Sequence, residues 1–168
     1  KQKQVTISVS SYEKEKQLLH ILKDIQEIAY CTFKEPSNYL HIGRFAKTLH
    51  ERDNNYDFIL TKAQILVWLT ETTTGDVEEL TLTSGGRLLW ESINCEFETK
   101  KEKIWEESFY VRAQKRLESS LLVITNHESV SKVIHQDDTK KLSDYILVDE
   151  SHLFANTVRK TKGIHLTY

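Results

Sequence analysis

Residues 121–125 (LLVIT) form a continuous apolar run of strand length, and residues 145–148 (YILV) form a second one. Strands that are buried on both faces have this pattern, which is typical of parallel sheets covered by helices. Residues 128–134, between the two runs, have the length and spacing of a short crossover helix. The three segments together predict a β-α-β unit and an α/β fold.

The beginning of the chain has the same alternation of strand and helix. Residues 5–9 (VTISV) are rich in β-branched side chains and predict a strand. From residue 12 to about residue 28 apolar side chains recur at helical spacing, and Ser10 or Ser11 is available as the N-cap. Residues 29–33 predict a second short strand.

The middle of the chain is predicted to be mostly helical. One helix is expected from its cap at Ser37 to Leu49. A second is expected over residues 58–69, which are apolar almost all the way round and therefore typical of a helix buried inside a bundle. Residues 104–117 again have helical spacing, whereas residues 80–86 are ambiguous.

The length of 168 residues suits one domain that carries an insertion. We expect the first part of the α/β domain at residues 1–35, the helical insert at residues 36–117, and the rest of the α/β domain at residues 118–168.

The charge and the hydropathy pattern restrict the possible partners. Lys and Arg total 23 while Asp and Glu total 25, so the formal net charge of -2 provides no global basic field for nucleic acid, and any such site must be local. No apolar run approaches the roughly 18 residues of a membrane span, and no signal peptide is recognisable. We therefore expect a cytoplasmic protein with no membrane partner. The absence of an initial methionine predicts an internal piece of a longer protein.

Polar residues follow three of the predicted strands. Ser8 and Ser10 end the first strand, Asn126 and His127 follow the run at 121–125, and residues 149–152 (DESH) follow the last strand. Ligands of open parallel sheets bind outside the carboxyl ends of the strands. These strand ends are therefore the predicted ligand-binding edge.

The adjacent carboxylates Asp149 and Glu150 are the strongest chemical signal. One carboxylate at such a position can hold Mg²⁺, usually through water, while the other polarises an attacking water. The alternative is that Asp149 or Ser151 only caps the helix that follows. The histidine at position 152 favours the catalytic interpretation.

Several segments resemble one family of helicases. Residues 149–152 resemble the Asp-Glu-Ala-His box of superfamily 2 helicases, with serine in place of alanine. Residues 125–127 (TNH) resemble the (T/V)NH segment of DinG-type helicases, which are relatives of the XPD family, and residues 34–41 (KEPSNYLH) resemble their KGRSNYLC segment. Residues 109–113 (FYVRA) resemble their FYFRAR run, and residues 5–19 resemble their motif Ia strand and helix. The resemblances follow the family order across nearly the whole chain.

This resemblance implies a fold, an activity and three residue roles. The fold would be a partial RecA-like parallel sheet interrupted by the helical insert. The activity would be that of an ATP-dependent DNA helicase, which couples ATP hydrolysis to movement on single-stranded DNA in DNA repair or replication. The resemblance implies that Asp149 binds the Mg²⁺ of MgATP, that Glu150 is the general base, and that His152 links the nucleotide and DNA sites.

The chain departs from the family at the iron-sulphur cluster. Family members with this cluster use four cysteines, the first in the SNYLC segment and the last just before the FYF run. His41 and Ser108 stand at those two positions, and Cys95 is the single cysteine between them. Because a [4Fe-4S] cluster needs its thiolates, we expect no cluster. This resembles the DinG branch of Gram-positive bacteria, in which the helicase-like part follows an exonuclease domain.

A phosphate-binding loop is missing from the sequence. None of the five glycines begins a GxxxxGK[ST] loop. In the family this loop lies upstream of motif Ia, which fits an internal fragment of the first motor domain without the second motor domain. We therefore expect this fragment alone to be inactive as an ATPase. The alternatives are a non-catalytic nucleic-acid-binding or interaction module that retains a helicase-like relic, and a Mg²⁺-dependent hydrolase of another kind.

The candidate DNA contacts combine the strand ends with basic and aromatic residues that can bind phosphates and stack on bases. They are Ser8, Ser10, Asn126, His127, Lys101, Trp105, Arg112, Lys115 and Arg116. For the residues of the insert the alternative is a solvated helix face with core aromatics, because interspersed glutamates dilute the positive charge.

Overall fold

The computed structural model describes residues 3–25, 27–52, 54–96, 108–135 and 143–161. These residues form two compact units. The sheet unit lies within residues 1–34 and 115–168, and the helical unit lies within residues 35–114. The chain thus leaves the sheet unit after its second strand and re-enters it within a helix.

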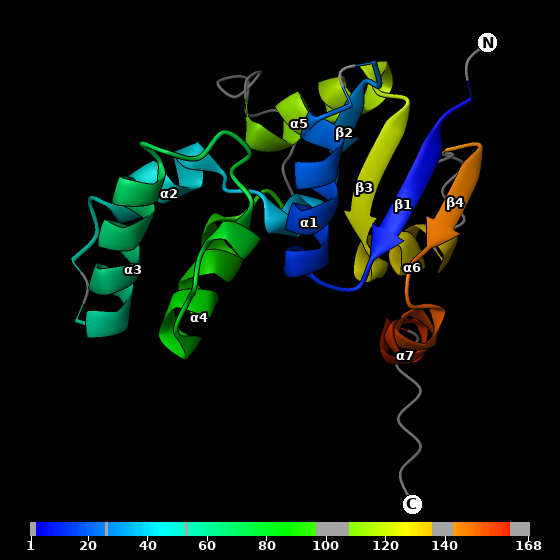
Figure 1. Ribbon diagram of the computed structural model, residues 1–168. Helices are drawn as coiled ribbons and strands as arrows, with labels where there is room; N and C mark the ends of the chain where they lie inside the picture. The colour runs from blue at the N-terminus through cyan, green and yellow to red at the C-terminus, as the bar shows by residue number, and fades with distance from the viewer. Residues whose placement is uncertain (1–2, 26, 53, 97–107, 136–142, 162–168) are drawn as a thin grey trace, which may run out of the picture. The chain divides into compact units, whose positions relative to one another are not determined.

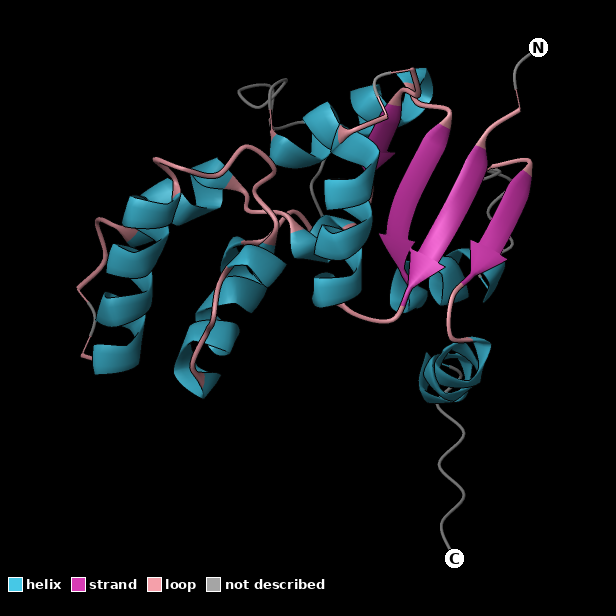
Figure 2. Cartoon of the chain, viewed as in Figure 1, coloured by secondary structure: helices cyan, strands magenta, loops and turns pink. Residues whose placement is uncertain are grey.

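The sheet unit contains a four-stranded parallel sheet in the order β2-β3-β1-β4 (Figures 1 and 2). The strands are β1 (Val5–Val9), β2 (Tyr30–Thr32), β3 (Leu122–Asn126) and β4 (Tyr145–Val148). β1 pairs with β3 on one side and with β4 on the other, so Ser8 lies opposite both Thr125 and Val148. The predicted α/β fold with a parallel sheet is confirmed, and it is consistent with a partial RecA-like fold.

Helix α1 (Tyr12–Lys23) packs on one face of this sheet. Ser11 is its N-cap, and the Ser11 hydroxyl accepts a hydrogen bond from the Lys14 amide at 3.3 Å. Leu22 of the helix forms a buried cluster with Val9 of β1 and Ile124 of β3. The apolar spacing of α1 therefore has a core to face.

The end of α1 differs from the prediction. The helix ends at Lys23, whereas the apolar spacing predicted a helix to about Ile28. Ile25 and Ile28 are 41% and 39% exposed. Because these side chains do not reach the core, nothing in the packing extends the helix to them.

Helix α6 (His127–His135) covers the other face of the sheet, and α7 (Ser151–Thr161) packs against α6. The predicted crossover helix at 128–134 is confirmed. Successive side chains of a strand point to opposite faces, so Thr6 and Ser8 alternate with the apolar residues that face α1. Thr6, Ser8 and Thr125 are all fully buried. The α6 side of the sheet is therefore a polar interior.

Strand β4 does not have the burial that its sequence predicts. Tyr145, Ile146 and Leu147 are 51%, 40% and 56% exposed, so the expectation of a strand buried on both faces is wrong for the described residues. β1 pairs with one edge of β4, and no strand in the described ranges pairs with the other. An edge strand lacks the second neighbour that would help to bury it.

The helical unit is mostly helical, as predicted. Its elements are η1 (Pro36–Asn38), α2 (Ile42–Thr48), α3 (Tyr56–Trp68), η2 (Val77–Glu79), α4 (Ser84–Ile93) and the first part of α5 (Phe109–Ser119). Of the helix predicted at 104–117, residues 104–107 lie outside the described residues.

The start of α2 corrects one prediction. Residues around Ser37 form only the short turn η1, and the helix begins at Ile42. His41 is the cap, because its Nδ1 accepts a hydrogen bond from the Arg44 amide at 3.1 Å. Capping by a histidine ring is uncommon, so the sequence pointed to the serine instead.

Helix α4 arises from the segment that was ambiguous in the sequence. Thr83 is its N-cap and accepts a hydrogen bond from the Gly86 amide at 3.0 Å. A Cβ atom at Gly85 would lie 2.6 Å from the Asp57 Cβ, so glycine allows α3 and α4 to approach closely at this point. The two glycines obscured a helix in the sequence because they are weak helix formers.

Helix α3 is buried on one side only. Ile65 is fully buried, and Trp68 packs edge-to-face on Trp90 of α4, with ring centroids 6.3 Å apart. Ile59 and Val67 are 51% and 66% exposed, so the prediction of a helix buried all round is wrong for the described residues. Among the helices described, none has the length and apolar character that crossing a membrane requires.

Candidate functional site

The carboxyl ends of β1, β3 and β4 lie at the same edge of the sheet, because the three strands are parallel and adjacent (Figure 2). The first residues beyond these strands carry the side chains that the sequence singled out. Two side-chain hydrogen bonds and one backbone hydrogen bond connect these three strand ends.

Glu150 is the most constrained residue at this edge. Its φ of 46° is in the left-handed region, which residues other than glycine rarely adopt. The Ser10 hydroxyl, which follows β1, donates a hydrogen bond to Glu150 Oε2. This hydrogen bond is the main cause that lowers the pKa of Glu150, and Lys14, His152 and His127 lower it further. Glu150 is therefore a carboxylate, the form that a general base requires.

Asp149 is exposed and lies beside Glu150. Its amide donates to the Ser8 carbonyl at 2.9 Å, which extends the pairing of β1 with β4, and its Oδ1 accepts from the Glu150 amide at 3.0 Å. The first turn of α7 closes on a different atom, the Glu150 carbonyl, which accepts from the Leu153 amide at 2.8 Å. The observed Asp149 contact precedes α7, so it does not support the helix-capping alternative.

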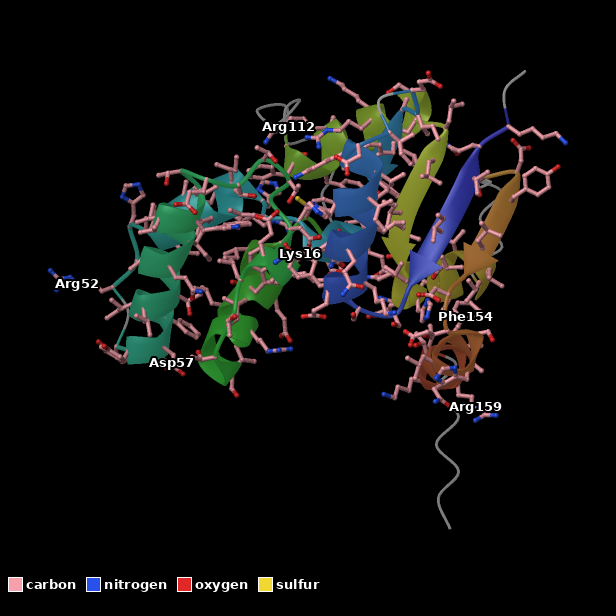
Figure 3. All side chains as sticks on the ribbon, in the orientation of Figure 1. Lys16, Arg52, Asp57, Arg112, Phe154 and Arg159 are labelled. Carbon is pink, nitrogen blue, oxygen red and sulfur yellow. The ribbon has the colours of Figure 1, made fainter. Side chains whose placement is uncertain are left out.

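His127 is buried at the end of β3. Its Nδ1 lies 2.7 Å from the Ser8 Oγ, and its ring packs edge-to-face on Phe154 of α7 with centroids 5.4 Å apart (Figure 3). Burial lowers the pKa of His127, and the negative charges of Asp149 and Glu150 partly offset this effect. A neutral ring at this position connects β1, β3 and α7.

The other predicted site residues have different environments. His152 is exposed on the first turn of α7, where its charge acts on Glu150. Asn126 caps α6, because its Oδ1 accepts from the Ser129 amide at 2.9 Å. Sequence spacing gave no sign of this capping role.

The basic candidates do not share the strand ends. Lys115 and Arg116 are exposed on α5, an element distinct from the loops that follow the strands. Arg112 belongs to the helical unit, and its guanidinium lies 4.4 Å from the centroid of the Phe109 ring. Lys101 and Trp105 lie outside the described residues.

The positions that correspond to cluster cysteines are used for packing and capping in the helical unit. His41 is 2% exposed and caps α2, and Cys95 is 1% exposed. The Ser108 hydroxyl accepts from the Val111 amide at 3.2 Å at the start of α5. In the ranges that the structure describes, no three histidine, cysteine, aspartate or glutamate side chains converge to hold a metal ion.

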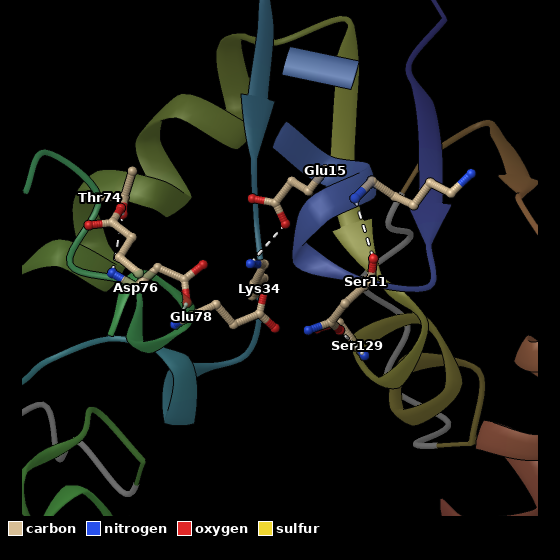
Figure 4. A network of polar contacts seen from close by, with 10 residues as sticks. Ser11, Glu15, Lys34, Thr74, Asp76, Glu78 and Ser129 are labelled. Carbon is tan, nitrogen blue, oxygen red and sulfur yellow. Dashed lines mark hydrogen bonds and ion pairs between the residues drawn. The ribbon is translucent and has the colours of Figure 1, made fainter. Parts of the chain in front are cut away.

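Two features of the sheet unit escaped sequence reasoning. Lys34 Nζ forms a 2.8 Å ion pair with Glu15 Oε2, and both side chains are at least 96% buried (Figure 4). Phe154 packs on His127 from α7. No local spacing relates residue 15 to residue 34 or residue 127 to residue 154, so the sequence offers no signal for either contact.

Comparisons with known proteins place this site in context. The chain is 42% identical over 145 residues to a Bacillus subtilis protein named 3'-5' exonuclease DinG, covering 84% of this chain. It is 29% identical over 158 residues to a protein of the same name from Staphylococcus saprophyticus, covering 89% of the chain.

The matched regions are 16% and 17% of those two proteins, so the chain spans about a sixth of their length. No protein-family model matches the sequence. The sequence similarity to these proteins supports a DinG-like family for this chain.

Proposed function

We propose that this chain is a segment of the first motor domain of a DinG-like, ATP-dependent DNA helicase or nuclease-linked ATPase that acts on single-stranded DNA. The observation that carries the proposal is the arrangement of Asp149 and Glu150 at the carboxyl end of β4, connected through Ser8 and Ser10 to the end of β1. In open α/β sheets this edge is where ligands bind.

The proposed roles follow from the geometry of the two carboxylates. Asp149 is exposed and supplies a carboxylate oxygen, the donor type that Mg²⁺ prefers. An ion held mainly by nucleotide phosphates and water needs few protein ligands, so one carboxylate fits. Such an ion would neutralise the developing charge of the phosphates. Glu150 would accept a proton from the attacking water, and His152 would relate the nucleotide site to the DNA path.

The relatives suggest a larger setting for this segment. Proteins named 3'-5' exonuclease DinG are about six times as long as the matched region. We propose that the phosphate loop, a second motor domain and an exonuclease domain lie in other parts of a longer cytoplasmic protein. In this proposal no iron-sulphur cluster is present, because His41 and Ser108 replace two of its cysteines.

A direct test uses the longer protein that carries this segment. ATP hydrolysis is measured with and without a single-stranded oligonucleotide, and we expect the oligonucleotide to increase the rate. A protein that binds single-stranded DNA but hydrolyses no ATP in either condition would contradict a motor.

The 168-residue chain by itself is expected to bind ATP only weakly and not to hydrolyse it. The reason is that its sequence has no GxxxxGK[ST] loop whose amides could hold the β- and γ-phosphates. Isothermal calorimetry with MgATP checks this expectation. Micromolar binding by the isolated chain would show that the phosphates have another site.

The purified protein is expected to be colourless. Cys95 is one thiolate where a [4Fe-4S] cluster needs four, and it is buried against protein. An absorbance spectrum after purification without oxygen, together with iron analysis, checks this. A visible band that disappears on iron chelation would overturn the cluster-free proposal.

A further inference from the structure

The contact between Ser10 and Glu150 joins the first loop of the sheet unit to the proposed general base. Ser10 lies in the connection between β1 and α1, and its hydroxyl donates to Glu150 Oε2. Glu150 accepts this hydrogen bond while its backbone is in the left-handed region, at φ 46°. The side chain of the base is thus oriented by a residue that lies 140 positions away in the sequence.

Both sides of Ser10 are anchored. On one side, the Ser8 carbonyl accepts from the Asp149 amide at 2.9 Å, and β1 pairs with both of its neighbours. On the other side, Ser11 caps α1 (Figure 4). A movement of the β1–α1 connection therefore changes the Ser10 contact before it disturbs either element.

The hydroxyl of Ser10 cannot serve two acceptors at once. A serine hydroxyl has one hydrogen to donate, and in this structure the hydrogen goes to Glu150. A phosphate oxygen is only an acceptor, so a phosphate that takes the hydrogen bond of Ser10 must release Glu150.

We propose that Ser10 is a positioning residue that restrains Glu150 when no DNA is bound, and that a phosphate of single-stranded DNA releases Glu150 by taking this hydrogen bond. The proposal rests on the function proposed above and adds its regulation. The restrained carboxylate has one oxygen occupied by a donor, which opposes the acceptance of a proton from water. Released, the carboxylate accepts that proton as water attacks. DNA binding and hydrolysis are thereby coupled through one hydroxyl.

The test is Ser10→Ala in the longer protein, with ATP hydrolysis measured without DNA and at saturating single-stranded oligothymidylate. We expect the DNA-independent rate to rise about tenfold, because a hydrogen bond to a charged group no longer has to be broken. The rate at saturating DNA should stay within about twofold of the wild-type rate. The stimulation ratio therefore falls. A purely structural role for Ser10 predicts that both rates fall together, and that result would overturn the proposal.

Two matched comparisons separate the hydroxyl from its shape and from loop stability. Ser10→Thr keeps the donor and should retain stimulation, whereas Ser10→Val has nearly the same shape without the donor and should behave like Ser10→Ala. Ser11→Ala removes the cap of the same connection. Its stimulation ratio should equal that of the wild type.

Failure of this inference can be distinguished from failure of the proposed function. If the wild type is stimulated by DNA and Glu150→Gln is inactive, but Ser10→Ala and Ser10→Val keep the wild-type ratio, the motor assignment stands and the restraint is wrong. If Glu150→Gln hydrolyses ATP at the wild-type rate, both proposals are wrong.

Discussion

Replacement of Glu150 by glutamine is expected to reduce ATP hydrolysis in the longer protein by roughly 10²- to 10⁴-fold, the usual contribution of a general base. Glutamine has nearly the same shape, but its amide does not accept a proton from water. Nucleotide binding should remain, because Asp149 is unchanged. DNA-stimulated hydrolysis and the affinity for MgATP, both measured on the folded variant, are the two readouts.

Asp149→Ala is the matched comparison for this prediction. It removes the proposed metal carboxylate, so the affinity for MgATP itself should fall. If both residues had only structural roles, each substitution would lower the free energy of unfolding by about 1 kcal/mol and leave the turnover of folded molecules nearly intact. Wild-type turnover in Glu150→Gln would remove the main support for a motor.

Replacement of Lys34 by methionine is expected to lower the free energy of unfolding of the sheet unit by about 3–5 kcal/mol. The Lys34 side chain has no exposed surface and the Glu15 side chain has 4%, with their charged atoms 2.8 Å apart. Methionine fills a similar volume but leaves the Glu15 charge buried without its ion-pair partner. Denaturant unfolding followed by circular dichroism measures the loss.

The exposed pair between Lys132 and Glu128 of α6 provides the control. Its atoms are 2.9 Å apart, but the side chains are 36% and 60% exposed. Lys132→Met should therefore cost no more than about 0.5 kcal/mol. The double change Glu15→Leu with Lys34→Met should recover much of the loss, because no uncompensated charge remains. A Lys34→Met variant as stable as Lys132→Met would show that the buried pair contributes little.

Local sequence patterns were sufficient for the elements that share one core. β1 and β3 were predicted almost residue for residue, because β-branched and apolar runs of this length favour strands. α1 and α6 followed from helical spacing, and Ser11 from the chemistry of an N-cap.

The same patterns failed where another element decides what is covered. The apolar run of β4 predicted burial on both faces, and that of α3 predicted burial all round, yet Leu147 and Val67 are 56% and 66% exposed. Periodicity shows which residues share a face, but it does not show whether anything packs on that face. The cap of α2 and the glycine-rich start of α4 were missed because a histidine ring and two glycines are atypical at a helix start.

The sequence by itself determined the parallel α/β fold and the three polar strand ends, because both depend on the order and length of apolar runs along the chain. Only the tertiary structure decided which of those polar residues meet. Ser10 donates to Glu150, Ser8 contacts His127, and Lys34 pairs with Glu15. Parallel pairing brings residues about 120 to 140 positions apart to one sheet edge. The strength of their hydrogen bonds depends on distance and burial, which no local spacing in the chain specifies.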